Sequence, residues 1–175
     1  MRQLRGGLPV GLRLSGTRAR WDYARSNQIE RLDYVPSPAT RELAASLLDV
    51  HPERREAPSK ELLDRLAAEL SVPRVNLHFL NSPQKHKRSG GRLTYKEYAH
   101  YELDSGITIY NVTAIRRQYL APRSYLDTLV HEFLHHLDYH LLGLQHTFHT
   151  RGFYSRLSDL MGKLLPPKAA QLELF

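Results

Sequence analysis

The chain of 175 residues contains no cysteine. This absence excludes disulfide bonds, cysteine nucleophiles and zinc sites built from thiolates. It fits a reducing compartment but does not establish one, since secreted proteins can also lack cysteine. No stretch reaches the ~18 consecutive apolar residues of a membrane helix, and the N-terminal segment lacks the apolar run of a signal peptide. We therefore expect a soluble, cytoplasmic protein that does not bind membranes.

Acidic residues are fewer than basic ones, 18 against 25, which gives a formal net charge of +7. Much of the basic excess lies in residues 1–35 and in the loop 84–92. The arginines of the first segment are Arg2, Arg5, Arg13, Arg18, Arg20 and Arg25. Basic clusters can contact phosphates without reading a base sequence, so we predict DNA as a partner of both segments. Solvated basic loops are the alternative interpretation.

The length and the 41 % of hydrophobic residues predict one domain with a modest core. Residues 1–35 have no lasting hydrophobic period and are predicted to form a basic N-terminal arm. Residues 36–72 carry leucines at helical spacing and predict a helical segment packed on the core, with Ser59 as a helix cap. Residues 73–165 form the predicted domain core, and residues 166–175 a C-terminal tail.

The hydrophobic period changes to two after residue 73. Residues 75–79 (VNLHF), 93–103 (LTYKEYAHYEL) and 107–112 (ITIYNV) are each typical of a β-strand. A polar, basic loop at 81–92 separates the first two. We therefore expect an α+β fold in which two or three antiparallel strands precede a long helix.

Residues 129–157 contain six of the ten histidines. The pattern around them predicts a helix that starts with a capping box of Ser124 and Asp127 and ends at Gly143. Its apolar stripe consists of Leu126, Val130, Phe133, Leu137 and Leu141.

His131 and His135 enclose Glu132 in an HExxH motif on this helix. Positions i and i+4 lie one turn apart on the same face, so the two imidazoles can bind one metal ion. Because they lie off the apolar stripe, core packing does not account for them. Glu132 can accept a proton from metal-bound water. The motif predicts a zinc site with Glu132 as the general base; a chance match on a histidine-rich surface helix is the alternative.

A catalytic zinc ion needs a third protein ligand and leaves its fourth position to water. Residues 139–158 contain no Asp or Glu, which excludes a downstream glutamate ligand at the usual spacing. The compact HExxHxxGxxH pattern also fails, because Asp138 and Leu141 occupy the positions of its glycine and last histidine.

Three histidines remain as candidates for the third ligand. His140 lies on the same helix, but five residues after His135 it has turned away from the ligand face. His146 and His149 follow a chain reversal. We prefer His149 because it opens the next predicted helix, at residues 151–165, and His146 is the second choice.

Four other residues near the motif have simpler expected roles. His136 and His140 are expected to be surface residues or spare polar residues. Asp138 either orients a ligand without binding the metal itself or is an ordinary exposed carboxylate. Tyr154 is expected to pack at the start of the next helix rather than to stabilise an oxyanion.

The segment resembles the SprT-like (Spartan-like) zinc metallopeptidases, whose pattern is HExxH followed by a histidine in an HGxxF sequence. Residues 149–154, HTRGFY, are similar to that second motif, with Thr150 in place of the glycine. The resemblance covers residues 73–165, and no cysteine-based zinc ribbon follows.

This resemblance implies a minimal zincin-like fold, with a small sheet packed on the active-site helix. It implies that His131, His135 and His149 bind Zn²⁺ and that Glu132 acts as the base. The strand at residues 106–112 would then hold the substrate backbone by strand addition.

The last five residues, QLELF, resemble the pentapeptide by which bacterial proteins bind the sliding clamp of DNA polymerase, with Glu173 at its central position. Leu172, Leu174 and Phe175 would enter an apolar pocket, and Gln171 would add hydrogen bonds.

Together these patterns predict a zinc-dependent metallopeptidase that hydrolyses protein or peptide substrates. The DNA-related features extend the prediction to DNA-associated or crosslinked proteins as substrates and to recruitment by the sliding clamp. One alternative is a DNA- or clamp-associated binding protein with a structural or vestigial zinc site and no protease activity. Another is a cytoplasmic metallopeptidase with no role on DNA.

Overall fold

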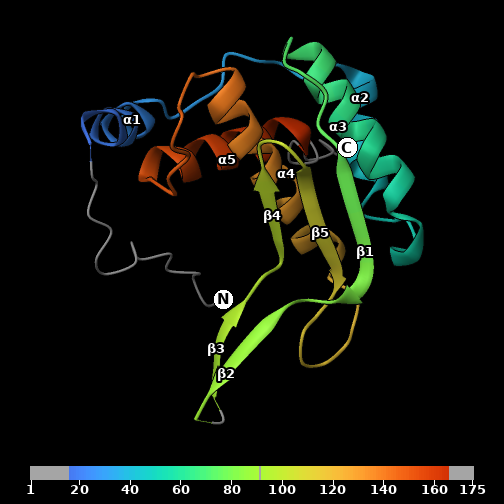
Figure 1. The fold of residues 1–175 in the computed structure, drawn as a ribbon. Coiled ribbons are helices and arrows are strands. Elements are labelled where there is room, and N and C mark those ends of the chain that lie inside the picture. Colours follow the sequence, from blue (N-terminus) through green and yellow to red (C-terminus); the bar gives the residue numbers. More distant parts are fainter. Residues whose placement is uncertain (1–15, 91, 166–175) are drawn as a thin grey trace, which may run out of the picture.

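Helices lie behind and above a small mixed sheet, as viewed in Figure 1, in this computed structural model, which describes residues 16–90 and 92–165. The helices are α1 (Thr17–Gln28), α2 (Pro38–Ser46), the 3-10 helix η1 (Pro52–Arg54), α3 (Glu56–Glu69), α4 (Pro122–His140) and α5 (Arg151–Leu164). The strands are β1 (Leu77–Pro83), β2 (His86–Ser89), β3 (Arg92–Lys96), β4 (Ala99–Glu102) and β5 (Gly106–Val112). The predicted α+β class is confirmed. No helix among the described residues is long and apolar enough to cross a membrane.

The three-stranded sheet has the order β1-β5-β4. Strand β1 runs parallel to β5, with Leu77 opposite Ile107, whereas β4 runs antiparallel to it. The prediction of an antiparallel sheet is therefore wrong for β1. Alternation of apolar residues identifies a strand but not its direction, and residues 84–105 are long enough to return the chain for a parallel pairing.

A second, two-stranded sheet is the hairpin of β2 and β3, which projects away from the helices in Figure 1. The predicted polar loop at 81–92 is thus partly strand. The single strand predicted at 93–103 is divided into the end of β3 and all of β4. Both errors have one cause: polar, tyrosine-rich strands outside the core lack a continuous apolar pattern.

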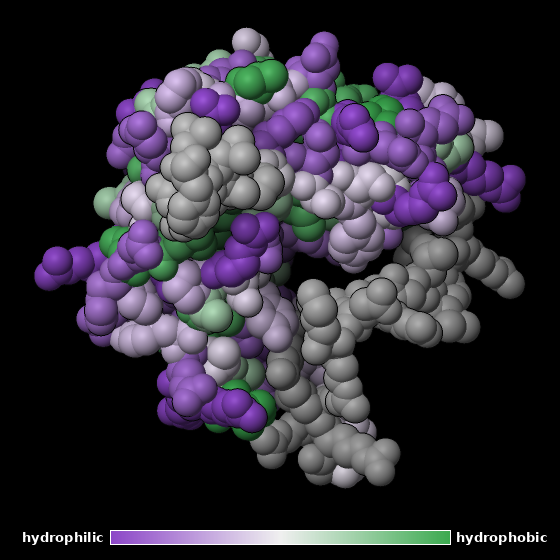
Figure 2. Space-filling view, turned by 180° about the vertical axis from the view of Figure 1, so that it is seen from behind, coloured by the Kyte–Doolittle hydropathy of each residue, from purple (hydrophilic) through white to green (hydrophobic). Residues whose placement is uncertain are grey.

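Helix α4 lies at the centre of one continuous core and contacts β4, β5 and α5. The predicted stripe is buried except for Leu141, which is 41 % exposed because α4 ends at His140. The leucines of α3 also lie in this core as predicted. The face shown in Figure 2 is mostly hydrophilic, with small hydrophobic areas between the polar side chains.

The predicted N-terminal arm is wrong for residues 16–35. They form α1, which contacts α5, and a following segment whose Leu32 and Tyr34 lie in the core. Helix α1 escapes a search for apolar periodicity because its buried residues are small or polar: Ala19, Asp22 and Ser26.

Two predicted helix starts are also wrong. Helix α3 begins at Glu56, so Ser59 lies inside it and its hydroxyl hydrogen-bonds the Tyr125 hydroxyl at 2.8 Å. Helix α4 begins at Pro122, whose missing N–H costs nothing in the first turn. Asp127 therefore lies too deep in α4 to complete a capping box and pairs with Arg123 instead, at 3.3 Å.

Candidate metal centre

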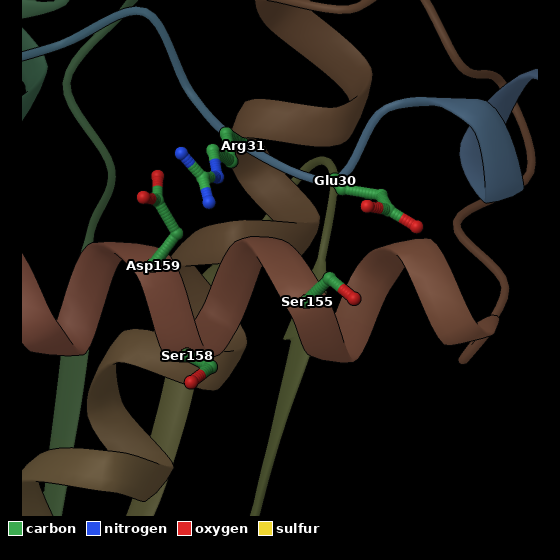
Figure 3. A pocket seen from close by; sticks show the side chains of 5 residues that line it. All are labelled: Glu30, Arg31, Ser155, Ser158 and Asp159. Carbon is green, nitrogen blue, oxygen red and sulfur yellow. The ribbon is translucent and has the colours of Figure 1, made fainter.

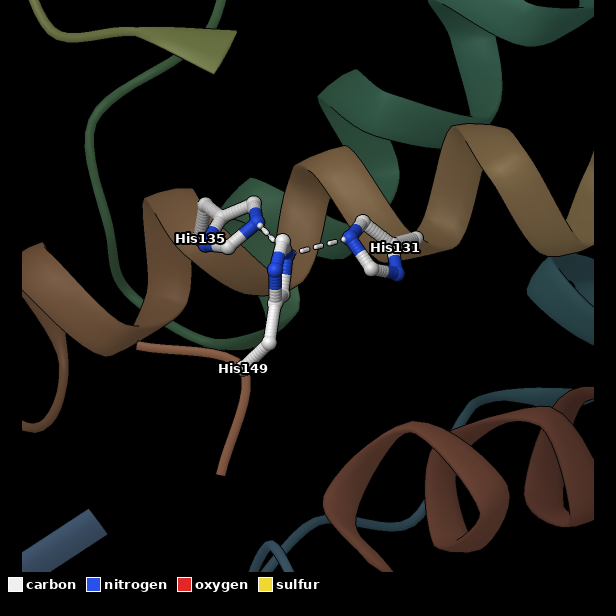
Figure 4. A group of neighbouring side chains, drawn as sticks. All are labelled: His131, His135 and His149. Carbon is white, nitrogen blue, oxygen red and sulfur yellow. Dashed lines mark hydrogen bonds between the residues drawn. The ribbon is translucent and has the colours of Figure 1, made fainter. Parts of the chain in front are cut away.

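Two of the predicted ligands, His131 and His135, come from consecutive turns of α4 (Figure 4). The apolar stripe fixes the rotation of α4 on the core, and this rotation turns both imidazoles towards the segment before α5. His149 lies on that segment, and its ring points back between the other two in Figure 4.

The three rings meet through their Nε2 atoms. The Nε2 of His149 is 2.9 Å from that of His131 and 3.0 Å from that of His135. The ligand atoms of the three residues all lie within 4.8 Å of one another. Two Zn–N bonds of ~2.0–2.1 Å in tetrahedral geometry place their nitrogens ~3.3 Å apart, so the three rings are close enough to bind one metal ion.

Phe153, fully buried in the first turn of α5, packs against all three imidazoles. Its ring centre is 4.7 Å from that of His135, 4.9 Å from that of His131 and 5.2 Å from that of His149. The sequence offered Phe153 only as part of the family motif; the structure shows that it forms the apolar floor of the cluster.

Desolvation lowers the pKa of all three imidazoles, including that of the exposed His149, and so favours the neutral form that binds metal. It lowers the pKa of His131 to about 4, with a further contribution from His149. It lowers the pKa of His135 to about 2, with contributions from His131 and His149. The Nδ1 of His135 is buried and has no hydrogen-bond partner. The three neutral imidazoles, whose Nε2 atoms converge, fit a cation bound through Nε2.

Glu132, between the two helix ligands, is only 7 % exposed. Burial raises the pKa of its carboxyl to about 7, although a hydrogen bond from the backbone of Tyr101 in β4 lowers it. The negative charge of Glu97 adds to the increase. A backbone group of strand β4 thus contacts the carboxyl group of Glu132.

Asp138 takes neither of the two roles considered for it. Its carboxylate is fully buried and accepts two hydrogen bonds from Nη2 of Arg156, at 2.9 and 2.8 Å. Arg156, also fully buried, lies on α5. This ion pair joins α4, which carries two of the predicted ligands, to α5, which follows the third. The sequence did not indicate the pair, because 18 residues separate Asp138 from Arg156.

His146, the second choice for the third ligand, does not join the cluster. Its Nδ1 donates to Oδ2 of Asp22 at 2.8 Å, and its backbone N–H donates to the same oxygen at 3.1 Å. His146 therefore binds α1, whereas His149 lies with the other two histidines.

His136 was expected to be a surface residue or a spare polar residue, and it is neither, because it is only 3 % exposed and both of its ring nitrogens have partners. Its Nε2 lies 2.8 Å from the carbonyl of Pro73, and its Nδ1 lies 3.1 Å from the hydroxyl of Tyr101. His140 is exposed, as expected. Tyr154 is 40 % exposed, with its ring stacked on His149 at 6.0 Å.

A surface pocket lies elsewhere on α5 (Figure 3). Ser155, Ser158 and Asp159 line it from α5, and Glu30 and Arg31 from the segment after α1. It contains none of the clustered histidines.

The tail residues Gln171, Leu172, Leu174 and Phe175 lie outside the described residues.

Comparison with protein-family models, with curated proteins and with solved structures finds no match for this chain.

Proposed function

We propose that the protein is a zinc-dependent metallopeptidase of the SprT-like type, with a zincin-like arrangement of sheet and helix. The observation that carries the proposal is the convergence of three Nε2 atoms, from His131, His135 and His149. Three imidazoles suit Zn²⁺ and leave a coordination position for water. The motif supplies a carboxyl group, Glu132, between the two helix ligands.

Each residue has a defined part in peptide hydrolysis. His131, His135 and His149 would hold the ion, which when bound polarises a carbonyl group and lowers the pKa of a water molecule. The Glu132 carboxylate accepts a proton from the attacking water and passes it to the leaving amine. The backbone hydrogen bond from Tyr101 keeps that carboxylate in place.

The substrate strand would pair with β4 rather than with β5, the strand suggested by the sequence. Strand β5 is hydrogen-bonded on both sides, to β1 and to β4, so it has no free edge. Strand β4 is an edge strand of the sheet and contacts α4, which carries Glu132. An extended peptide can add to such an edge through main-chain hydrogen bonds.

The decisive experiment measures zinc content and peptide cleavage together. The wild type is expected to bind about one zinc per chain and to cleave an unfolded protein substrate. Glu132→Gln should retain the zinc and lose activity by ~10²–10⁴-fold, because the general base is removed and the ligands are not. A folded, metal-free wild type, or full activity in Glu132→Gln, would refute the proposal.

DNA is the partner that we propose for the exposed face of α1. Trp21 is 45 % exposed, with the guanidinium groups of Arg18 and Arg25 at 4.6 and 5.1 Å from its ring centre. Asp22, the acidic residue of α1, is buried. An aromatic ring flanked by cations suits stacking of bases in a single strand.

DNA binding is tested with Trp21→Ala and Arg25→Ala, using Lys60→Ala on α3 as the matched control. Trp21→Ala is expected to lose the ~1–3 kcal/mol of one base stack. Arg25→Ala is expected to weaken binding and to reduce its salt dependence, because one phosphate contact is lost. Equal affinity of all three variants for a single-stranded oligonucleotide would exclude this face.

The same face fits a second candidate function, a DNA-associated binding protein whose zinc is structural. This candidate predicts zinc and DNA binding without cleavage of any substrate.

Recruitment by the sliding clamp is a separate proposal for the tail: deletion of residues 171–175 should abolish clamp binding and leave the zinc content unchanged.

A further inference from the structure

The segment that carries His149 has no regular secondary structure. It connects the end of α4 to the start of α5 and includes Gly143, whose φ of 66° lies in the left-handed region. A ligand on such a segment is only as fixed as the contacts around it, because exposed segments with few buried contacts open easily. In this protein many of those contacts come from α1.

Asp22 of α1 is the first of these contacts. Its fully buried carboxylate accepts the backbone N–H and the Nδ1–H of His146, three residues before the proposed ligand. Arg18 pairs with the other oxygen of the same carboxylate at 3.0 Å and also donates to the carbonyl of Gly143. Helix α1 therefore holds the segment at two points.

Ser26, one turn further along α1, makes the second contact. Its hydroxyl lies 2.8 Å from that of Thr150, the residue directly after His149, and both groups are buried. Thr150 also caps α5 by accepting the N–H of Phe153 at 3.0 Å. At Gly152 the two helix backbones touch, because a Cβ there would lie 1.9 Å from the carbonyl oxygen of Ser26.

Arg156 connects these contacts to the HExxH helix. Its Nη1 donates to the carbonyls of Ser26 and Ile29 at the end of α1. Its Nη2 donates to the Ser26 hydroxyl and to Asp138, which lies three residues after His135 on α4. A buried chain of hydrogen bonds thus runs from α4 through α5 to α1 and back to the residue beside His149.

We propose that helix α1 is a structural part of the metal site and that Asp22 and Ser26 are positioning residues, which hold His149 within reach of His131 and His135. The inference rests on the proposed function in one respect: it requires that the three histidines bind a metal ion. It does not require peptide hydrolysis.

The test measures the affinity of the full-length chain for Zn²⁺ and Co²⁺ by competition with a chelator. Asp22→Ala is expected to weaken both affinities by ~10–100-fold, the usual effect of losing a residue that orients a ligand. The visible absorption of the Co²⁺ form should also change, since the third imidazole is no longer held in one geometry. Asp22→Asn keeps an acceptor for the His146 N–H and should recover most of the lost affinity.

Glu30→Gln is the matched control. It removes a carboxylate near the same helices, where Glu30 pairs with Arg151 at 2.7 Å, without removing a contact to residues 143–150. Its metal affinity should equal that of the wild type. If Asp22→Ala does not fold, His146→Ala decides, because its half-exposed ring can be removed without opening the core. It should keep one metal per chain at reduced affinity.

Hydrogen exchange on the metal-free protein gives a readout that is independent of metal and activity. Asp22→Ala should accelerate exchange of the amides in residues 144–150 and leave those of α4 unchanged.

The inference would be overturned if folded Asp22→Ala and His146→Ala bound metal as tightly as the wild type and showed the same hydrogen exchange in residues 144–150. A wild type that binds no metal would overturn it together with the proposed function. Metal binding that weakens as expected, in a protein that cleaves nothing, would reject the peptidase alone.

Discussion

The two sides of the proposed metal centre are built in different ways. His131 and His135 are fixed by the geometry of one helix, which is itself locked into the core. His149 depends on contacts between residues far apart in the chain, such as the pairing of Asp22 with His146 across 124 positions. The placement of His131 and His135 follows from a short sequence motif. The placement of His149 depends on contacts that form only when the chain folds.

The comparison is sharpest when the histidines are removed one at a time. His131→Ala and His149→Ala each remove a proposed ligand. Each should therefore lower zinc affinity by more than the ~100-fold expected when a residue that only orients a ligand, such as Asp22, is removed. His146→Ala should keep the stoichiometry of one, since His146 binds Asp22. Zinc content and chelator competition measure both quantities. Loss of zinc in His146→Ala with retention in His149→Ala would reverse our assignment.

Asp138→Ala tests the connection between the two sides. It leaves the Arg156 guanidinium buried beside an empty position, and breaking a buried pair in this way costs ~3–5 kcal/mol of unfolding free energy. Denaturant unfolding measures the loss. The double variant Asp138→Leu/Arg156→Met buries no charge and should recover part of the loss, but not all of it, because it also removes the hydrogen bonds from Arg156 to Ser26 and Ile29. A loss below about 1 kcal/mol in Asp138→Ala would mean that the pair does not connect the helices as described.

Two glycines of α5 test the contact with α1 directly. Gly152→Ala places a methyl group against the Ser26 carbonyl and should cost ~1–3 kcal/mol, because backbone atoms must move. Gly162→Ala in the same helix meets nothing within 4 Å and should be neutral or stabilise by up to ~1 kcal/mol through helix propensity. Thermal or denaturant unfolding compares them. Equal effects at the two positions would contradict the close packing of α1.

The smallest effect is expected at Glu69, which anchors the segment after α1 to α3. Burial raises the pKa of Glu69, but hydrogen bonds from Ser37, Thr40 and Tyr34 outweigh it and lower the pKa from 4.5 to about 2. A lowered pKa means that the ionised group stabilises the folded state above pH 4.5 and that this stabilisation is lost as the pH falls towards 2.

Glu69→Gln should therefore be less stable than the wild type at neutral pH, by a small amount because the carboxylate is exposed. The difference should shrink between pH 4.5 and 2, as shown by unfolding at several pH values. A difference that does not change with pH would show that the charge of Glu69 contributes nothing. Metal affinity should not change, because Glu69 contacts Tyr34, Ser37 and Thr40 and neither α1 nor the segment that carries His149.

The sequence predicted what depends on spacing within one element. The HExxH pair, the buried stripe of α4 and the start of α5 next to His149 all follow from helical periodicity and from the polar residues at helix ends. The preference for His149 over His146 agrees with the cluster in the structure. Several failures depended on partners distant in sequence: the direction of β1, the burial of His136 and the pairing of Asp138 with Arg156. The starts of α3 and α4, which are local features, were also predicted wrongly.

Helix α1 is the clearest example of such a failure. Its buried face consists of Ala19, Asp22 and Ser26, so it has almost no hydrophobic signal, and its arginines suggested a solvated arm. The spacing of three and four residues between these positions was present in the sequence. It could not be interpreted without knowing that α5 offers a glycine, a capping threonine and a buried arginine to the same face.

The long separation between Asp22 and His146 also has a consequence for synthesis on the ribosome. Helix α1 is made first, but the residues that it holds emerge more than 120 positions later. A nascent chain that has exposed α4 alone offers an incoming cation two imidazoles. If the three histidines bind a metal ion as proposed, stable loading requires that α5 has left the exit tunnel and has packed against α1.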